Sequence, residues 1–329
     1  MGIKKLNMLL REKCSKQSIS KQDLRYIENK TIVVDTSIYL YRFASENALM
    51  DNMYLLISIL LSFNITPIFV FDGKPPPEKQ KLLAQRRMEK REAEQKYNCI
   101  QSNLSTIGLN DDDKNELILE MEQLRQQFIR ITERDIQKVK GLMKAYGVSY
   151  YDAPGEADEV CAYMVKNGLA WACLSDDMDM FLYGCPIVLR NISLIHKTVL
   201  VYDTSAILCD LNISESLFRG IMVLAGTDYN LNTDISVYKA NEMFHEYIES
   251  NNYETSEDLT LNGFYEWVYT NINNTINLND LYHINGMFNM NNINCMDDIK
   301  YHPMQTQHIQ NKQICSIMEK EGFVFTEKV

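Results

Sequence analysis

Short apolar runs that end in an aspartate constrain this chain more than any other feature of its sequence. Residues 31–35 read Thr-Ile-Val-Val-Asp, and residues 67–72 read Pro-Ile-Phe-Val-Phe-Asp. Such β-branched and aromatic runs are typical of strands that are buried on both faces of a parallel sheet. Between them lies an apolar stretch, residues 38–63, whose length favours a helix. The pattern therefore predicts a strand–helix–strand unit.

The alternation continues further along the chain. Strands are predicted over residues 148–152, 171–174, 187–190 and 198–201, with a helix over residues 153–166. Alternating strands and helices favour an α/β fold, with a mostly parallel central sheet and helices on both faces. Beyond Leu211 the pattern is helical, over residues 215–224, 238–249 and 263–269. Residues 271–294 are rich in asparagine, which favours a looped segment.

A highly charged segment interrupts the sheet pattern after residue 77. Residues 78–96 lack Gly and Pro and hold seven Lys or Arg against four Glu, so they predict a basic helix. A loop over residues 108–113 and a second long helix, residues 115–146, follow. Neither helix shows the wide apolar stripe of a core element, so we expect an excursion from the domain. The predicted regions are 1–76, 77–146, 147–229 and a divergent helical and Asn-rich region, 230–329.

Composition excludes several classes of protein. Lys and Arg number 33 and Asp and Glu 44, so the net charge of −11 excludes a uniformly basic nucleic-acid coat but not a local basic patch. The eight cysteines form no CxxC pair or zinc-like cluster, which favours free thiols in a reducing compartment. No secretory signal or membrane-spanning run is visible. We therefore expect an intracellular, soluble protein that is not secreted.

Acidic residues follow the predicted strands or lie at the starts of the next segments. The seven are Asp35, Asp72, Glu156, Asp158, Asp177, Asp179 and Asp228. Because ligands of parallel sheets bind beyond the carboxyl ends of the strands, these side chains could converge on one edge. Clustered carboxylates repel one another unless cations offset them, and oxygen-only ligands favour Mg²⁺ or Mn²⁺. Two such ions are a common device for phosphodiester hydrolysis.

Simpler interpretations stay open for each of these residues. An aspartate after a strand is usually a turn or cap residue, and Glu156 and Asp158 could favour a helix N-terminus. The basic helix could be a solvated, salt-bridged face. However, Lys79 and Arg86 are two helical turns apart and could together meet a phosphate. Tyr41 could be a core aromatic or a platform on which a base stacks.

Several motifs resemble those of the flap endonuclease family of structure-specific 5′ nucleases, which includes the xeroderma pigmentosum group G nuclease. They cover about residues 1–230 in the family's order. The motifs are Met-Gly-Ile-Lys-Lys-Leu at 1–6, the run at 33–41, Phe-Val-Phe-Asp-Gly-Lys-Pro-Pro at 69–76, Ala-Pro-Gly-Glu-Ala-Asp at 153–158, Ser-Asp-Asp-Met-Asp at 175–179 and Leu-Ala-Gly-Thr-Asp-Tyr at 224–229.

The resemblance implies a PIN-like nuclease core, built from residues 1–76 and 147–229, with a helical arch over residues 77–146. It implies one Mg²⁺ among Asp35, Asp72, Glu156 and Asp158, and a second among Asp177, Asp179 and Asp228, with Mn²⁺ as a substitute. It implies that Lys79 and Arg86 contact the scissile phosphate, that Tyr41 stacks near the scissile nucleotide and that Gly2 lies close to DNA. Further expected nucleic-acid contacts are Lys81, Arg87 and Lys239.

The family cleaves 5′ flaps from branched DNA, often with 5′→3′ exonuclease activity, in replication, repair or recombination. Residues 235–238, Ile-Ser-Val-Tyr, stand where the family has a Gly-Ile-Gly-Pro turn that holds K⁺ against duplex phosphates. Ile235 and Val237 would obstruct that approach, which argues against the K⁺ site and for altered duplex anchoring. Lys239, just after, is retained in type.

Other substrates and partners remain open. The alternatives are an RNA-degrading nuclease on the same core, a junction resolvase and a catalytically inactive nucleic-acid-binding scaffold. Replication or repair proteins are possible partners, although no clear sliding-clamp motif is visible. The Asn, Ile, Tyr and Lys usage suggests an AT-rich genome, such as that of a large DNA virus or a protozoan parasite, and hence action in the nucleus or at viral cytoplasmic replication sites.

Overall fold

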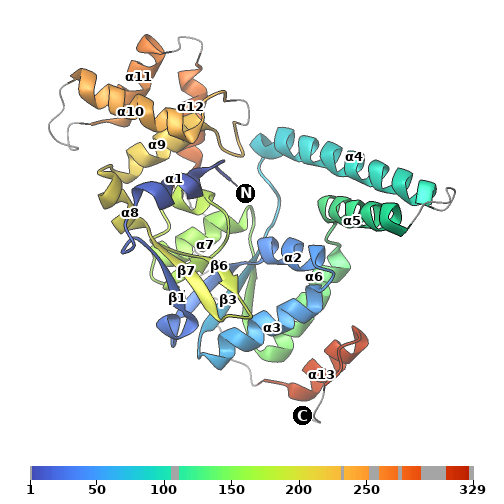
Figure 1. Cartoon of the computed structure of the whole chain (residues 1–329). Helices are drawn as coiled ribbons and strands as arrows, with labels where there is room; N and C mark the ends of the chain where they lie inside the picture. The colour runs from blue at the N-terminus through green and yellow to red at the C-terminus, as the bar shows by residue number, and fades with distance from the viewer. Residues whose placement is uncertain are drawn as a thin grey trace. The chain divides into compact units, whose positions relative to one another are not determined.

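The computed structural model describes residues 2–104, 111–230, 233–251, 259–272, 276–289 and 309–325 (Figure 1). They form two compact units. The sheet unit comprises residues 1–36, 59–74 and 149–305, and the helical unit comprises residues 37–58, 75–148 and 306–329. Within the described ranges, no helix is long and apolar enough to cross a membrane.

The sheet unit is built on one sheet, to which the described residues contribute seven strands. These are β1 (Ile19–Asp23), β2 (Thr31–Asp35), β3 (Thr66–Phe71), β4 (Ser149–Asp152), β5 (Ala172–Leu174), β6 (Ile187–Ser193) and β7 (Thr198–Asp203). Their order is β1-β7-β6-β5-β2-β3-β4. The strands from β6 to β4 run parallel, whereas β7 and β1 join antiparallel. The predicted mostly parallel sheet is confirmed.

Helices of the sheet unit cover this sheet and share its core. They are α1 (Leu6–Lys13), α7 (Ala157–Lys166), α8 (Thr204–Leu211), α9 (Glu215–Ala225), α10 (Val237–Asn251), α11 (Leu261–Asn271) and α12 (Leu278–Met287). Buried apolar side chains of the central strands pack together with those of α1, α7, α9, α10 and α11 in this core. The predicted loop over residues 271–294 is wrong where α12 forms, and residues 273–275 and 290–294 lie outside the described residues. Its first turn is capped by the Asn277 side chain, and Leu281 and Ile284 bury one face.

The helical unit holds most of α2 (Thr36–Ser45) and α3 (Leu49–Ser62), with α4 (Gln80–Leu104), α5 (Asp111–Gln127), α6 (Glu133–Tyr146) and α13 (Asn311–Lys320). α4 follows a 3₁₀ turn, η2 (Pro77–Lys79), which confirms the predicted basic helix. The single helix predicted over residues 38–63 is wrong. The chain breaks between α2 and α3, where Asn47 has a φ of +54°.

The single helix predicted over residues 115–146 is also wrong. Thr132 and Asp135 form a reciprocal capping box that starts α6 afresh. The view that this segment lacks a core face fails for α6, which buries Val139, Leu142 and Met143. α13 packs on α6, and Lys138 on α6 pairs with Glu321 just beyond α13. Of the predicted loop over residues 108–113, residues 108–110 lie outside the described residues, and residues 111–113 form the start of α5 instead.

Candidate functional site

Parallel strands bring acidic residues to one edge of the sheet. Asp35 is the last residue of β2, and Asp72 directly follows β3. β5 leads into the acidic loop, which we define as residues 175–182, and β4 leads toward Glu156 at the start of α7. Because β5, β2, β3 and β4 are parallel neighbours, their carboxyl ends share an edge.

Asp35 lies at the centre of this edge and is only 4% exposed. Its Oδ2 accepts a hydrogen bond from Ser175 Oγ at 2.9 Å. Burial and the negative charges of Asp72 and Asp177 together raise the pKa of Asp35 to about 7, against hydrogen bonds with Ser175 and Asp158 that lower it. Four carboxyl groups therefore interact at one point, where a cation would relieve their repulsion.

Asp72, and not Glu156, caps the N-terminus of α7 with its side chain. Glu156 occupies the N-cap position of α7, yet its side chain forms no capping bond. Asp72 Oδ1 instead accepts the Ala157 N–H at 2.8 Å. Glu156 Oε2 accepts a hydrogen bond from the Tyr229 hydroxyl at 2.5 Å. The Glu156 carboxylate is thus directed to other partners than the helix end.

The acidic loop is buried rather than solvated. The Asp177 N–H donates to Ser175 Oγ and the Asp179 N–H to Asp177 Oδ1, each at 3.1 Å. Asp179 begins a 3₁₀ turn, η3 (Asp179–Phe181), and is 2% exposed. Gly2 packs against this pair: a Cβ on Gly2 would lie 2.4 Å from Oδ1 of both Asp177 and Asp179. Asp177 and Asp179 are therefore held by the fold and not by solvent.

Tyr229 and Tyr183 were missed by the sequence analysis. Burial and the nearby Glu156 carboxylate raise the pKa of Tyr229, and Asp179 adds to the effect. The hydroxyls of Tyr229 and Tyr183 lie 3.5 Å apart. No periodic or motif signal marks Tyr183, whereas Tyr229 directly follows Asp228, which is buried.

These contacts connect six of the seven predicted carboxylates, and Asp228 is adjacent to Tyr229 in the chain. Within the described ranges, no three Asp, Glu, His or Cys side chains form a ready-made metal-binding group. The donors are nonetheless all carboxylates, and burial together with charge repulsion raises the pKa of Asp35. This donor set fits hard divalent cations such as Mg²⁺ and Mn²⁺, not zinc or copper.

The predicted basic residues before and in α4, and Tyr41 in α2, belong to the helical unit. Lys79 lies in η2 and is buried, and Arg86 is half-buried on α4, whereas Lys81 and Arg87 are exposed. Tyr41 is 46% exposed, so the core-aromatic interpretation is wrong. Its ring centre lies 4.9 Å from Lys90 Nζ.

The segment that replaces the glycine turn lies at the start of α10. Val237 is buried and is the first residue of this helix. Lys239 is exposed and pairs with Glu242 at 3.4 Å and Glu246 at 3.7 Å. Neighbouring carboxylates therefore offset the charge of Lys239.

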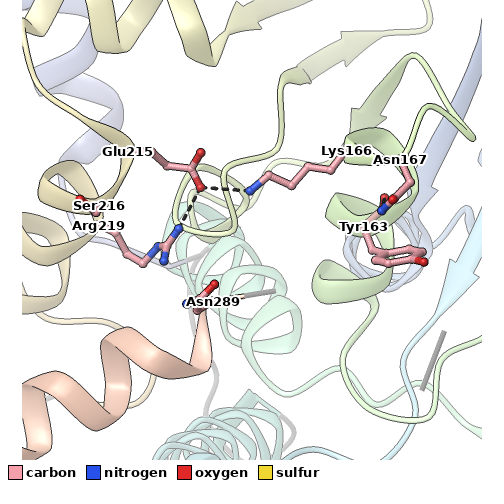
Figure 2. A pocket seen from close by; sticks show the side chains of 7 residues that line it. All are labelled: Tyr163, Lys166, Asn167, Glu215, Ser216, Arg219 and Asn289. Atoms are coloured by element: carbon pink, nitrogen blue, oxygen red, sulfur yellow. Dashed lines mark hydrogen bonds and ion pairs between the residues drawn. The ribbon is translucent and has the colours of Figure 1, made fainter. Parts of the chain in front are cut away.

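A separate cavity of about 610 Å³ lies near the end of α7 and the start of α9 (Figure 2). Its lining residues are Tyr163, Lys166, Asn167, Glu215, Ser216, Arg219 and Asn289. Lys166 Nζ and Arg219 Nη2 both bind Glu215 Oε1, at 3.0 and 2.8 Å. The cavity borders the opposite end of α7 from Glu156, and Glu215 partly offsets its two cations.

Two family models and several curated proteins match this sequence. The XPG N-terminal domain matches residues 1–93, and the XPG I-region matches residues 147–228. A flap endonuclease 1 from Methanococcus aeolicus is 32% identical over 271 residues, which are 75% of this chain and 78% of the relative. The chain belongs to the flap endonuclease family. A flap endonuclease 1 from Encephalitozoon cuniculi is 31% identical over 288 residues, 82% of this chain and 79% of the relative.

A solved structure has the same fold as this chain. The catalytic core of Rad2, solved in complex with DNA substrate, matches with a TM-score of 0.64 and 22% identity. The match covers 98% of this chain and 95% of the Rad2 core. At this identity the likeness concerns the fold, and it agrees with the predicted PIN-like α/β core.

Proposed function

We propose that this chain is a divalent-metal-dependent nuclease that hydrolyses phosphodiester bonds at 5′ flaps of branched DNA, with 5′→3′ exonuclease activity, in replication, repair or recombination. One observation carries the proposal. The strand ends that the family motifs occupy gather carboxylates around Asp35, whose pKa is raised to about 7 by burial and by these neighbouring charges. The XPG-domain matches span the same strands.

The metal ligands follow from this edge and from the family motifs. One Mg²⁺ would be held by Asp35, Asp72, Glu156 and Asp158, and a second by Asp177, Asp179 and Asp228, with Mn²⁺ able to replace either. Bound ions of this kind activate water and offset charge on a reacting phosphate. Ser175 supports the arrangement, because its hydroxyl donates to Asp35 and accepts from the Asp177 N–H.

The basic residues have the chemistry to hold the substrate. Lys79 and Arg86 would contact the scissile phosphate and stabilise the charge that develops on it. Tyr41 would stack near the scissile nucleotide, a role that its exposure permits. Gly2 would lie close to the DNA. Lys81, Arg87 and Lys239 would make weaker backbone contacts, and the pairing of Lys239 with two glutamates favours a small contribution.

The test is a cleavage assay on four end-labelled substrates: a 5′-flap DNA, a nicked duplex, a four-way DNA junction and a single-stranded RNA. Each is incubated with Mg²⁺, Mn²⁺ or EDTA. The proposal predicts metal-dependent cutting at the base of the flap. Asp177→Ala should abolish cutting while the flap DNA is still bound, and Asp152→Asn, which changes another strand-end aspartate, should cut normally.

Each other outcome would assign a different activity to this chain. Cutting of RNA with a silent flap would overturn the DNA assignment in favour of RNA decay. Preferential cutting of the four-way junction would indicate a resolvase. Substrate binding without cutting under any metal would indicate an inactive scaffold.

A further inference from the structure

The acidic loop is held in part by hydrogen bonds from residues outside it. It carries Asp177 and Asp179 in a buried position, where their mutual repulsion opposes a fixed geometry. Buried main-chain carbonyls also require hydrogen-bond donors. At each end of the loop, one main-chain carbonyl accepts a hydrogen bond from a buried arginine that lies outside the loop in the sequence.

At the first end, the donor is Arg190 of β6, which is 7% exposed. Its Nη2 donates to the Asp176 carbonyl at 2.6 Å, and its Nη1 donates to Asn7 Oδ1 at 3.1 Å. Asn7 lies on α1, a few residues after Gly2, and it also accepts from the Tyr202 hydroxyl at 2.7 Å. Arg190 therefore ties the loop to the N-terminal segment that packs on its carboxylates.

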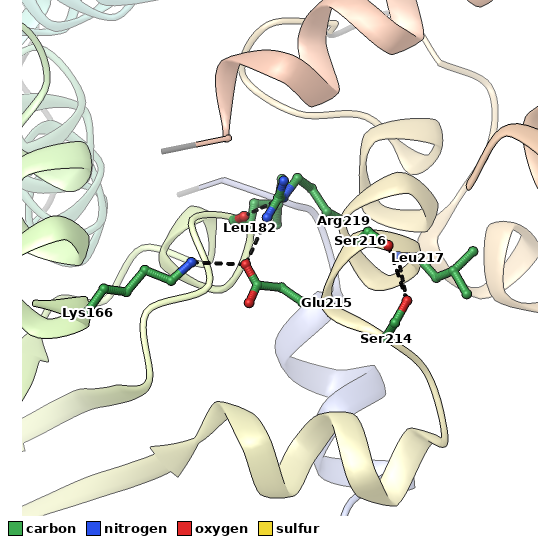
Figure 3. A network of polar contacts seen from close by, with 7 residues as sticks. All are labelled: Lys166, Leu182, Ser214, Glu215, Ser216, Leu217 and Arg219. Atoms are coloured by element: carbon green, nitrogen blue, oxygen red, sulfur yellow. Dashed lines mark hydrogen bonds and ion pairs between the residues drawn. The ribbon is translucent and has the colours of Figure 1, made fainter. Parts of the chain in front are cut away.

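At the second end, the donor is Arg219 of α9, which is 8% exposed. Its Nε donates to the Leu182 carbonyl at 2.9 Å, and its Nη2 pairs with Glu215 (Figure 3). The Leu182 N–H in turn donates to the Asp179 carbonyl at 2.9 Å. Arg219 therefore holds Leu182, and Leu182 in turn holds Asp179 through the hydrogen bond of the 3₁₀ turn. Lys166 donates to the same Glu215 oxygen, but among the described residues it makes no hydrogen bond to the acidic loop.

We propose that Arg190 and Arg219 are positioning residues that hold the two ends of the acidic loop and thereby set Asp177 and Asp179 for metal binding. The inference rests on the proposed function. An apolar side chain of similar length could fill either position without the cost of burying a guanidinium. It could not supply a donor to the loop carbonyl. Groups that orient metal ligands in this way typically contribute 10- to 100-fold to metal affinity or activity.

The test compares Arg190→Met and Arg219→Met with matched controls. Tyr202→Phe removes a hydrogen bond beside Arg190 and leaves the Asp176 carbonyl bonded. Lys166→Met removes an ion pair beside Arg219 and leaves the Leu182 carbonyl bonded. Two quantities are measured: the Mg²⁺ concentration that gives half-maximal single-turnover cleavage of a 5′-flap DNA, and the Mn²⁺ concentration that gives half of the metal-dependent rise in Tm without DNA.

Both arginine variants should raise the two half-saturating concentrations at least about tenfold. The controls should stay within about twofold of the wild type. Arg190→Lys and Arg219→Lys keep a donor on a different geometry and should recover part of the loss. If the methionine variants do not fold, the lysine variants decide, and the shift is then expected in them.

Equal half-saturating concentrations in the wild type and the folded arginine variants would overturn the inference. So would equal shifts in the control variants, because these would reflect general loss of packing. A wild type with no metal-dependent cleavage and no metal-dependent rise in Tm would instead refute the proposed function itself. The two failures are therefore distinguishable in one set of measurements.

Discussion

Gly2→Ala should slow cleavage of a 5′-flap DNA about 100-fold. The added Cβ would lie 2.4 Å from Oδ1 of both Asp177 and Asp179, whereas ordinary contacts begin at 3.4 Å. Either the two carboxylates or the N-terminal segment must therefore move by about 1 Å, the difference between these distances. A displacement of that size can reduce the rate of a positioned reaction by about 10²-fold.

The substitution also strains the backbone, and this effect can be separated. Gly2 has a φ of +71°, a conformation that costs a residue with a Cβ about 1 kcal/mol. Gly168 has a φ of +70°, and a Cβ there would meet no atom within 4 Å. Gly168→Ala is therefore a matched control, with the same strain and no contact with the acidic loop.

The assay is single-turnover cleavage of the 5′-flap DNA at saturating Mg²⁺, with Tm measured for both variants. Gly168→Ala should lower Tm by a few degrees and keep the wild-type rate. Gly2→Ala should lose rate far beyond any change in Tm. Equal rates for the two variants would refute the reasoning, because the acidic loop would then tolerate a displaced N-terminal segment.

Three further predictions follow from other contacts. Lys79→Ala and Arg86→Ala should each lower kcat more than they raise KM, as expected for contacts made in the transition state, and a change confined to KM would contradict that role. Hydrogen bonds from Ser18 Oγ and the Ser15 N–H lower the pKa of Asp210, so the stability they add is present above pH 4 and is lost on acidification. The difference in Tm between the wild type and Asp210→Asn should therefore be widest near pH 7 and vanish in strong acid; a constant difference would contradict this. Burial raises the pKa of Cys161 to about 11, so iodoacetamide at pH 8 should label the exposed Cys209 and leave Cys161 unmodified, as peptide mass spectrometry would show.

The central strands and the acidic positions could be predicted because their signals are local. Residues 31–34 are all β-branched and three of them are apolar, as expected for a strand that is buried between two neighbouring strands. The place of Asp35 at the edge of the sheet follows directly from its position at the end of this strand. β1 gave no such signal, because its sequence Ile-Ser-Lys-Gln-Asp is polar at four of five positions and its pairing with β7 decides its structure.

Residues that support the acidic edge could not be predicted, because their partners are distant in the sequence. Arg190 and Asp176 are 14 residues apart, Arg219 and Leu182 are 37 apart, and Tyr229 and Glu156 are 73 apart. Each contact requires the folded sheet. The predicted helix boundaries were wrong for a different reason. The cap that begins α6 depends on the single side chain of Thr132, which hardly changes the charged pattern of the surrounding sequence.

The most direct test of the central claim is the anomalous scattering of Mn²⁺ in crystals of the protein. Our account predicts two Mn²⁺ ions about 4 Å apart. One should contact Asp35 and its neighbours Asp72, Glu156 and Asp158, and the other should contact Asp177, Asp179 and Asp228. Mn²⁺ bound elsewhere, or no ion at this edge at millimolar Mn²⁺, would contradict the claim that these strands assemble a two-metal nuclease site.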